Sequence, residues 1–384
     1  MNKVVVIMVK PLEYLPPVMA LLQTLRSIGR EPVFICVQSA AGDAFLKQNH
    51  FEAYYIEYDR NLYLNNTFIT KVTHRITRMR RFFPRRRALA STIETIKRKY
   101  GYLTLWFVEI QSAALLGDRW KLYDNRAASI YELADFYGRT WLGFSFRDFI
   151  RETVLVEPEP NRAKEIQRHF NLTKLPNVVS NKPASHPRKY IGELPTRVQD
   201  VVKQASGRPI FLYQGVWTAD RKDVGVFIET IARNRPNYCI AVMPGEGYVT
   251  KLAQKYPNIY LLDYMPPPYH LAATSVASVG IAVYNQSGRT ELERKNALFC
   301  APNKIYEYAG FGIPTFGNRV PGLIDTVERA GAGVCVNINE REILAGADKL
   351  IENLPSFRAS ANRFFDNTDL ESQVRAVLKG AERV

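Results

Sequence analysis

The stretch Val4-Val-Val-Ile-Met-Val9 is a continuous apolar run rich in β-branched residues, which is typical of a strand buried on both faces of a sheet. A helical pattern begins at Pro16-Pro17 and ends at Gly29, and Pro32-Val-Phe-Ile-Cys-Val37 has the composition of a second buried strand. Strand, helix and strand at this spacing predict a βαβ unit and therefore a parallel sheet.

The same alternation continues along the chain and predicts a second α/β domain. In the first half we expect strands at residues 103–108, 128–133 and 154–156 and a helix at 162–170. The polar, Pro-containing stretch 181–189 indicates a linker between domains. In the second half we expect strands at 209–213, 238–242, 259–262, 279–283, 314–316 and 333–336, and helices at 224–233, 305–310, 343–351 and 370–377. This order predicts two Rossmann-like α/β domains whose parallel sheets face each other across a cleft.

Composition and charge narrow the class of protein. The 384 residues are 46% hydrophobic and 23% charged, which is typical of a folded globular chain. The net charge is +15, and residues 1–200 contribute +12 of it. Such an asymmetry indicates an anionic partner, which membrane phosphates, nucleic acid or a phosphorylated substrate would each satisfy.

Cysteines and the start of the sequence carry little functional information. Cys36, Cys239, Cys300 and Cys335 stand far apart in apolar contexts, so we expect four buried, reduced thiols. The apolar run before Lys10 is shorter than a signal peptide or a membrane span requires. We therefore expect a cytoplasmic protein without transmembrane segments.

The loop after the predicted strand 209–213 has residues suited to phosphate binding. Gly215 follows Gln214, and Arg221 and Lys222 come six and seven residues after the glycine. Ligands of open parallel sheets bind at the carboxyl ends of strands, where a glycine lets the backbone approach closely and cations hold phosphate. The alternative is an ordinary surface turn with two solvated charges.

A second candidate segment runs from Pro302 to Pro314. Pro302 and Asn303 suit a helix start, where backbone N–H groups favour an anion, and Lys304 adds a positive charge. Glu307 follows one turn later, where its carboxylate can accept hydrogen bonds from both hydroxyls of a ribose. The alternative is an amphipathic helix with an exposed glutamate.

Taken in order, these segments resemble the nucleotide-sugar domain of the family 4-like GT-B glycosyltransferases, the bacterial surface-polysaccharide type. The resemblance runs from Ile210 to about residue 350 and includes the turn at Gly245, the Asp263-Tyr-Met-Pro266 loop with His270-Leu271, and Gly331-Ala-Gly333. It implies domains at 1–183 for the acceptor and 184–365 for the nucleotide sugar. Residues 366–384 then form a terminal helix that packs back on the first domain.

The resemblance also implies roles for individual residues. Arg221, with Lys222 or Lys304, would hold the diphosphate of the donor, and Glu307 would bind its ribose. The backbone near Gly245, Tyr264 and Met265 would contact the base. Enzymes of this family stabilise the leaving diphosphate with cations and helix ends instead of a metal, and the sequence has no Asp-x-Asp motif. No cofactor is expected beyond the nucleotide-diphosphate-sugar substrate.

Two positions depart from the family pattern. Phe299 stands where retaining members have the first carboxylate of Glu-x7-Glu, next to the donor sugar. Glu109 lies in the segment Trp106–Ser112, which occupies the place of a His-x-His-Asp motif, so Glu109 is a candidate catalytic residue. Retention of anomeric configuration is the family expectation. Inversion would require a general base, for which Glu109 is the first candidate; the alternative is a structural glutamate at a strand end.

The segment 71–99 contains 11 Lys and Arg residues against one acid, Glu94. Basic charge with embedded aromatics is typical of a surface that docks on anionic membranes. The residues expected to contact the membrane or the acceptor are Arg78, Arg80, Arg81, Phe82, Phe83, Arg85, Arg86 and Arg87. Nucleic acid is a less favoured partner because no RNA- or DNA-binding signature is present. A solvated arm is the other alternative.

The sequence is therefore expected to encode a hexosyltransferase that moves a sugar from a nucleotide-diphosphate-sugar to an acceptor hydroxyl. The acceptor would be a glycan or a lipid-linked or cell-surface polysaccharide precursor, at the inner face of the cell membrane. Two alternatives remain: a sugar-nucleotide epimerase of the same fold, and a non-catalytic basic protein that binds membranes or nucleic acid.

Overall fold

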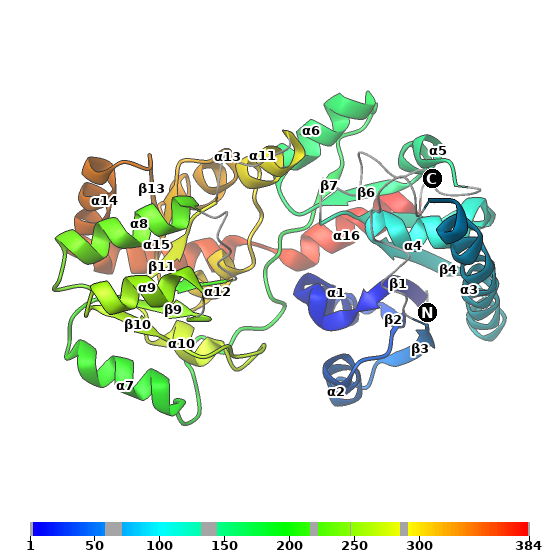
Figure 1. Cartoon of the computed structure of the whole chain (residues 1–384). Coiled ribbons are helices and arrows are strands. Elements are labelled where there is room, and N and C mark those ends of the chain that lie inside the picture. The colour runs from blue at the N-terminus through cyan, green and yellow to red at the C-terminus, as the bar shows by residue number, and fades with distance from the viewer. Residues whose placement is uncertain are drawn as a thin grey trace. The chain divides into compact units, whose positions relative to one another are not determined.

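The computed structural model describes residues 3–57, 71–131, 144–215, 222–245, 247–284 and 291–382, and it describes no side chains for residues 71–81, 222, 292 and 293. The chain forms two compact units: residues Met1–Ser180 with Leu370–Val384, and residues Asn181–Asp369. Each unit is an α/β domain around one parallel sheet (Figure 1). The predicted fold class is confirmed. The junctions lie at 180/181 and 369/370, beside the expected ones at 183/184 and 365/366.

Unit 1, which comprises Met1–Ser180 and Leu370–Val384, has a seven-stranded parallel sheet in the order β3-β2-β1-β4-β5-β6-β7. The strands are β1 (Lys3–Pro11), β2 (Glu31–Val37), β3 (Glu52–Ile56), β4 (Leu103–Val108), β5 (Arg126–Ser129), β6 (Val154–Glu157) and β7 (Asn177–Val178). Its helices are α1 (Pro16–Ser27), α2 (Ala40–Gln48), α3 (Lys71–Tyr100), α4 (Glu109–Leu116), α5 (Phe146–Glu152), α6 (Pro160–Phe170) and α16 (Leu370–Ala381). The expected strand at 128–133 overlaps β5, which begins and ends earlier.

The core of unit 1 follows from the alternation of side chains along β1. Val4, Val6 and Met8 point to one face, where they pack in a cluster with α1 and α16. Helix α16 reaches this cluster through Val374, Val377 and Leu378, which lie at helical spacing on one face. The last helix of the chain is therefore part of the core that the first strand begins.

Unit 2 has a six-stranded parallel sheet in the order β10-β9-β8-β11-β12-β13. The strands are β8 (Ile210–Gln214), β9 (Cys239–Met243), β10 (Ile259–Leu261), β11 (Val279–Ala282), β12 (Thr315–Asn318) and β13 (Gly333–Val336). The helices are α7 (Thr196–Ala205), α8 (Lys222–Asn234), α9 (Tyr248–Lys255), α10 (Leu271–Ser275), α11 (Glu291–Leu298), α12 (Lys304–Gly310), α13 (Pro321–Leu323), α14 (Glu340–Glu352) and α15 (Leu354–Asn367). Strands β8 to β13 match the six strands expected for this half of the chain.

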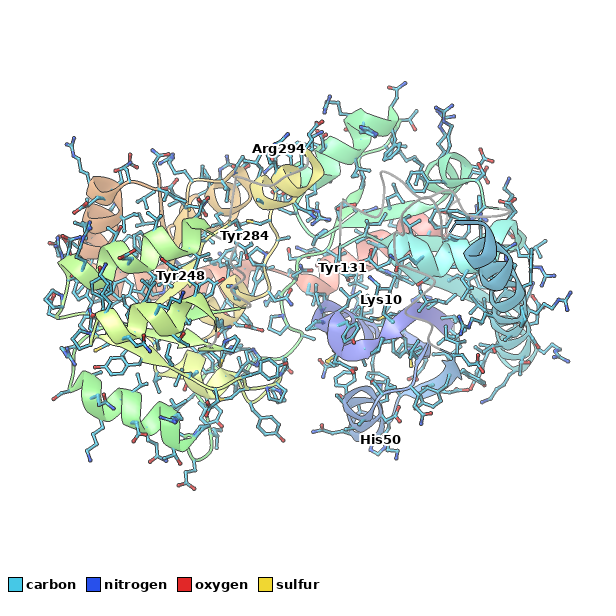
Figure 2. The ribbon with its side chains drawn as sticks, in the orientation of Figure 1. Lys10, His50, Tyr131, Tyr248, Tyr284 and Arg294 are labelled. Carbon is cyan, nitrogen blue, oxygen red and sulfur yellow. The ribbon has the colours of Figure 1, made fainter. Side chains whose placement is uncertain are left out.

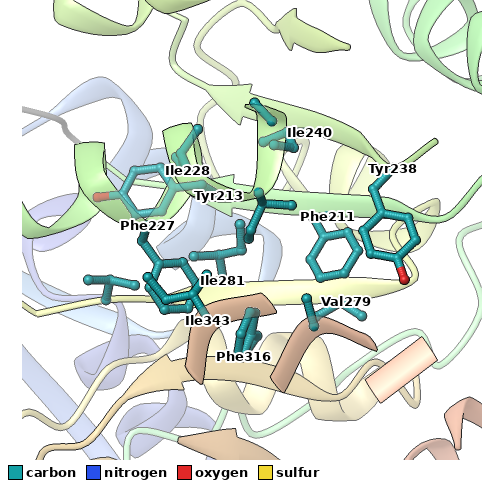
Figure 3. Close-up of a cluster of buried hydrophobic side chains, with 14 of the residues drawn as sticks. Phe211, Tyr213, Phe227, Ile228, Tyr238, Ile240, Val279, Ile281, Phe316 and Ile343 are labelled. Atoms are coloured by element: carbon teal, nitrogen blue, oxygen red, sulfur yellow. The ribbon is translucent and has the colours of Figure 1, made fainter. Parts of the chain in front are cut away.

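Alternate residues of the second sheet pack on helices at both faces. Phe211 and Tyr213 of β8 join Phe227 of α8 and Ile343 of α14 on one face, and Figure 3 shows this cluster. Ile210 and Leu212 join α7, α10 and α12 on the other. The four cysteines are buried thiols that form no disulfide with one another, as expected. In the described part of the chain, no helix is both long and apolar enough to span a membrane.

Candidate functional site

In each sheet the strand order reverses direction between two central strands. The reversal lies between β1 and β4 in unit 1 and between β8 and β11 in unit 2. Parallel sheets bind ligands outside the carboxyl ends of the strands at this switch point. Glu109 follows β4, Gln214 ends β8 and Gly215 follows it, so both predicted segments lie at a switch point.

In unit 2, the packing of Tyr308 fixes α12 beside the end of β8. Its ring lies directly over Gly280 of β11, where an added Cβ would come within 2.2 Å of the ring. The phenol oxygen lies 3.4 Å from the carbonyl oxygens of both Leu212 and Ile281. Because Tyr308 is fully buried, the turn of α12 that carries Lys304 and Glu307 is held at the carboxyl edge of the sheet.

Lys304 is brought against the end of β8. Its ammonium donates a hydrogen bond to the carbonyl of Gln214 and lies 4.9 Å from the centroid of the Tyr213 ring. Gly215 has φ +144°, and a Cβ there would lie 3.0 Å from Nζ of Lys304. The glycine is therefore needed both for its backbone conformation and for the space that the ammonium occupies. A positive charge is fixed at the switch point.

Glu307 lies in a polar network beside this charge. Nε2 of Gln214 donates to Oε2 of Glu307 at 2.8 Å, and Nε2 of His270 lies 3.1 Å from Oε1. The hydroxyl of Thr274 in turn donates to Oε1 of Gln214 at 2.9 Å. The Glu307 side chain retains 18% of its exposure, so the carboxylate is oriented by protein groups and still reaches solvent.

The other residues predicted for the diphosphate are placed only in part. Arg221 lies outside the described residues. Lys222 is the first residue of α8, and its side chain is not described. Asn303 is the N-cap of α12, but its side chain makes no capping hydrogen bond. Of the five predicted residues, the structure brings Gly215 and Lys304 together and places Asn303 next to Lys304.

The residues predicted near the base lie after neighbouring strands. Gly245 follows β9, donates its N–H to the carbonyl of Leu262 at 2.8 Å, and would place a Cβ 2.5 Å from Cβ of Leu261. Tyr264, beyond β10, is 66% exposed, and Met265 packs at the edge of the cluster around Leu212. Phe299, partly buried, follows α11. Gly245 is thus explained by close packing of the turn against β10.

Glu109 in unit 1 has an unusual backbone conformation. Its φ is +64°, in the left-handed region that non-glycine residues rarely adopt, although it begins α4. The side chain is 1% exposed, and Oε1 accepts a hydrogen bond from the N–H of Tyr131 at 3.2 Å. Figure 2 labels Tyr131, and also Lys10 near the end of β1. Backbone strain at a switch point is a feature of functional sites.

A buried ion pair supports the same edge of unit 1. Arg162 of α6 donates to Glu157 at 3.1 Å, and its guanidinium also lies 3.5 Å from the carbonyl of Ile130. Both side chains are at most 5% exposed. Burial raises the pKa of Glu157 to about 7 despite the neighbouring arginine. The pair links the start of α6 to the peptide between Ile130 and Tyr131, whose N–H binds Glu109.

The basic segment belongs to a 30-residue helix, α3, and the buried side chains from Phe82 onward exclude a solvated arm for that part of it. Leu89, Ile93 and Ile96 of this helix are fully buried. Phe82 is buried as well, so its prediction as a membrane contact is wrong. The prediction for Arg86 is also wrong, since its guanidinium donates to the carbonyls of Leu115 and Ala114 at the end of α4.

The remaining residues of the basic segment differ in exposure. Arg85 is 13% exposed and lies 3.7 Å from Glu57, so it contributes little free charge at the surface. Phe83 is 44% exposed, and Arg87, Lys97, Arg98 and Lys99 are exposed. Arg78, Arg80 and Arg81 belong to α3, but their side chains are not described.

Sequence reasoning missed the partners that orient Glu307. Gln214 and His270 were noticed only as parts of motifs, and Thr274 was not noticed at all. A usable signal existed, because a polar Gln ending an otherwise apolar strand needs a hydrogen-bonding partner when buried. Gln214 is 6% exposed.

No family model matches the chain, and no curated protein matches its sequence. Solved structures do match over the full length. A glycosyltransferase from Rickettsia africae is 11% identical with a TM-score of 0.66, covering 100% of this chain and 98% of that chain. WaaG, a glycosyltransferase involved in lipopolysaccharide biosynthesis, is 13% identical with a TM-score of 0.55, covering 99% of both chains. Anabaena HepE, in complex with UDP and glucose, is 12% identical with a TM-score of 0.63, covering 100% of both. The chain has the GT-B fold of these proteins.

Proposed function

We propose that this chain, which has the GT-B fold, is a glycosyltransferase that moves a sugar from a nucleotide-diphosphate-sugar to an acceptor hydroxyl. The observation that carries the proposal is the arrangement at the switch point of unit 2. There a fixed ammonium, the glycine that makes room for it and an oriented, partly exposed carboxylate lie together. This combination suits a nucleoside diphosphate, which has a vicinal diol and two phosphates.

The chemistry assigned to these residues follows from where charge develops. When the glycosidic bond to the donor breaks, negative charge grows on the leaving diphosphate, and fixed cations stabilise it. Lys304 would supply one such cation, with Arg221 and with Lys222 at the start of α8, so that transfer needs no metal ion. Glu307 would accept hydrogen bonds from the ribose. UDP is the favoured donor nucleotide, because the Anabaena neighbour was crystallised with UDP.

Glu109 is the residue proposed for the chemistry on the acceptor side. Its carboxylate is buried at the switch point of unit 1, where a strained backbone holds it. We expect retention of the anomeric configuration, as in the family that the sequence resembles. If nuclear magnetic resonance of the product shows inversion instead, Glu109 would be the base that takes the acceptor proton. Phe299 replaces the first carboxylate of the retaining pattern, so it is the second residue to substitute after Glu109.

The proposed acceptor is a lipid-linked or cell-surface polysaccharide precursor. The described exposed residues of α3 support it: Phe83, Arg87 four residues later in the helix, and Lys97 and Arg98. Lys99 is also exposed but pairs with Glu52 at 2.9 Å. Such a face would dock on anionic lipid, with each basic residue near the surface contributing about 1 kcal/mol. WaaG acts in lipopolysaccharide biosynthesis, which agrees with this class of acceptor.

The first experiment is a thermal shift against UDP, GDP, ADP, CMP and dTDP. A ligand at 100 times its dissociation constant stabilises the folded protein by about 2.7 kcal/mol, which is readily measured. We expect a selective shift that Glu307→Ala abolishes. No shift with any nucleotide would favour a non-catalytic basic protein. Conversion of a sugar nucleotide without any acceptor would favour an epimerase.

A further inference from the structure

The hydrogen bonds around Glu307 have a direction that chemistry fixes. An ionised carboxylate only accepts, so both neighbours must present protons to it. Gln214 therefore turns its amide nitrogen to Glu307, and its oxygen faces the hydroxyl of Thr274, which donates. His270 likewise presents an N–H from Nε2. His270 is the N-cap of α10, and Thr274 lies within this helix.

The other ring nitrogen of His270, Nδ1, indicates the role of the imidazole. Nδ1 is buried, and no described group of the chain forms a hydrogen bond with it. Nδ1 therefore has no acceptor for a proton, whereas an N–H on Nε2 points to Oε1 of Glu307 at 3.1 Å. Within the described residues, the polar contact of this side chain is its contact with Glu307.

We propose that His270 is a positioning residue that, with Gln214, sets the orientation of the Glu307 carboxylate for the ribose of the donor nucleotide. Each carboxylate oxygen has more than one lone-pair position, and each protein donor uses one of them. The remaining positions on the exposed side are left for two adjacent hydroxyls. This inference rests on the proposed function, since it takes the nucleotide to be the ligand of Glu307.

Two near-isosteric substitutions separate this role from a purely structural one. In His270→Gln the amide nitrogen can occupy the place of Nε2 and still donate to Glu307. In His270→Asn the amide reaches only the place of Nδ1, so the donor to Glu307 is lost. Binding of UDP and of its 2′,3′-dideoxy form is measured by calorimetry for the wild type and both variants, with unfolding temperatures as the check on folding.

We expect His270→Gln to bind UDP within about threefold of the wild type and His270→Asn to bind it about tenfold more weakly. The two variants should bind the dideoxy nucleotide equally, because it lacks the hydroxyls that Glu307 accepts. If His270→Asn unfolds, Thr274→Val tests the same network through Gln214. It should weaken binding of UDP and leave binding of the dideoxy form unchanged.

The inference is overturned if His270→Asn and Thr274→Val bind UDP as the wild type does. It is also overturned if the loss is equal for UDP and the dideoxy form, because the effect would then not pass through the ribose hydroxyls. A failure of the proposed function looks different: the wild type itself then binds no nucleotide, and the inference fails with it.

Discussion

Glu307 and Glu109 lie at the switch points of the two sheets, but the chain holds them in different ways. Glu307 belongs to a helix, keeps 18% exposure and is oriented by two side chains, Gln214 and His270. Glu109 is 1% exposed, has φ +64° and accepts a backbone N–H. A carboxylate oriented by side chains near solvent suits binding of a ligand. One held by strained, buried backbone suits a chemical role in which small displacements matter.

The comparison is tested most strongly by replacing each glutamate with its neutral isostere. If transfer inverts the anomeric configuration, so that Glu109 is the base, Glu109→Gln should lower the transfer rate by about 10²–10⁴-fold with UDP affinity unchanged. Glu307→Gln should weaken UDP binding instead. Steady-state kinetics with calorimetry separates the two effects, and Glu152→Gln, half-exposed in unit 1, is the control. If both variants change only affinity, the division of roles is wrong.

The next largest effect is on stability and concerns the buried pair of Arg162 and Glu157, which supports the peptide that binds Glu109. Arg162→Met leaves Glu157 buried without its charged partner, which costs about 3–5 kcal/mol of folding free energy. Urea unfolding measures this loss. Adding Glu157→Leu should restore much of the stability, because it removes the unpaired carboxylate. A single variant as stable as the wild type would show that the pair is not needed for the fold.

In unit 2, by contrast, the free energy of unfolding should fall in acid because of His186, which packs beside the helix that carries Glu307. This ring packs on Phe311 and Phe365 at 4.4 and 5.4 Å between centroids, beside Gly310 at the end of α12. Burial, and then the charge of Arg188, lowers the pKa of His186 from 6.5 to about 4. As the pH falls below 6.5, His186 becomes protonated in the unfolded chain, whereas in the folded chain it becomes protonated only near pH 4. Stability is therefore lost in that window.

Because of His186, the free energy of unfolding should fall by about 2 kcal/mol between pH 7 and pH 5. His186→Phe keeps the aromatic packing and should remove this part of the pH dependence. Urea unfolding at the two pH values measures both proteins. An unchanged slope in the variant would mean that other groups cause the acid sensitivity.

The smallest effect distinguishes exposed from buried cations on α3. Arg87→Gln should weaken binding to anionic vesicles about fivefold, since one basic residue near the lipid surface contributes about 1 kcal/mol. Arg86→Gln should instead lower the unfolding temperature, because the carbonyls of Leu115 and Ala114 lose their donor. Vesicle sedimentation and thermal unfolding measure the two outcomes. Equal vesicle binding by wild type and Arg87→Gln would count against membrane docking through this face.

The fold was largely predictable from the sequence because its central strands are continuous apolar runs. Val4–Val9 lies within β1, and residues 103–108 and 333–336 match β4 and β13. Helix α3 was not predicted, because its many cations obscured the stripe formed by Leu89, Ile93 and Ile96. The edge strands β3 and β7 were also missed. Their residues are only partly buried, so their apolar pattern is weak.

The site was predictable only where one local segment carries the chemistry. Lys304 and Glu307 share one turn of helix, so their closeness follows from spacing alone. The contact of Glu307 with His270, 37 residues earlier in the chain, depends on how α10 packs beside α12, which no local pattern encodes. The left-handed backbone of Glu109 was likewise invisible, because glutamate gives no sign of a positive φ.

The placement of α16 has a consequence for how the protein is made. Val374, Val377 and Leu378 belong to the same core as Val4 and Leu21, yet the whole of unit 2 lies between them in sequence. Unit 2 therefore leaves the ribosome before the helix that completes the core of unit 1. Until α16 emerges, the face of unit 1 that carries Val4 and Leu21 lacks the side chains of Val374, Val377 and Leu378 that cover it in the folded protein.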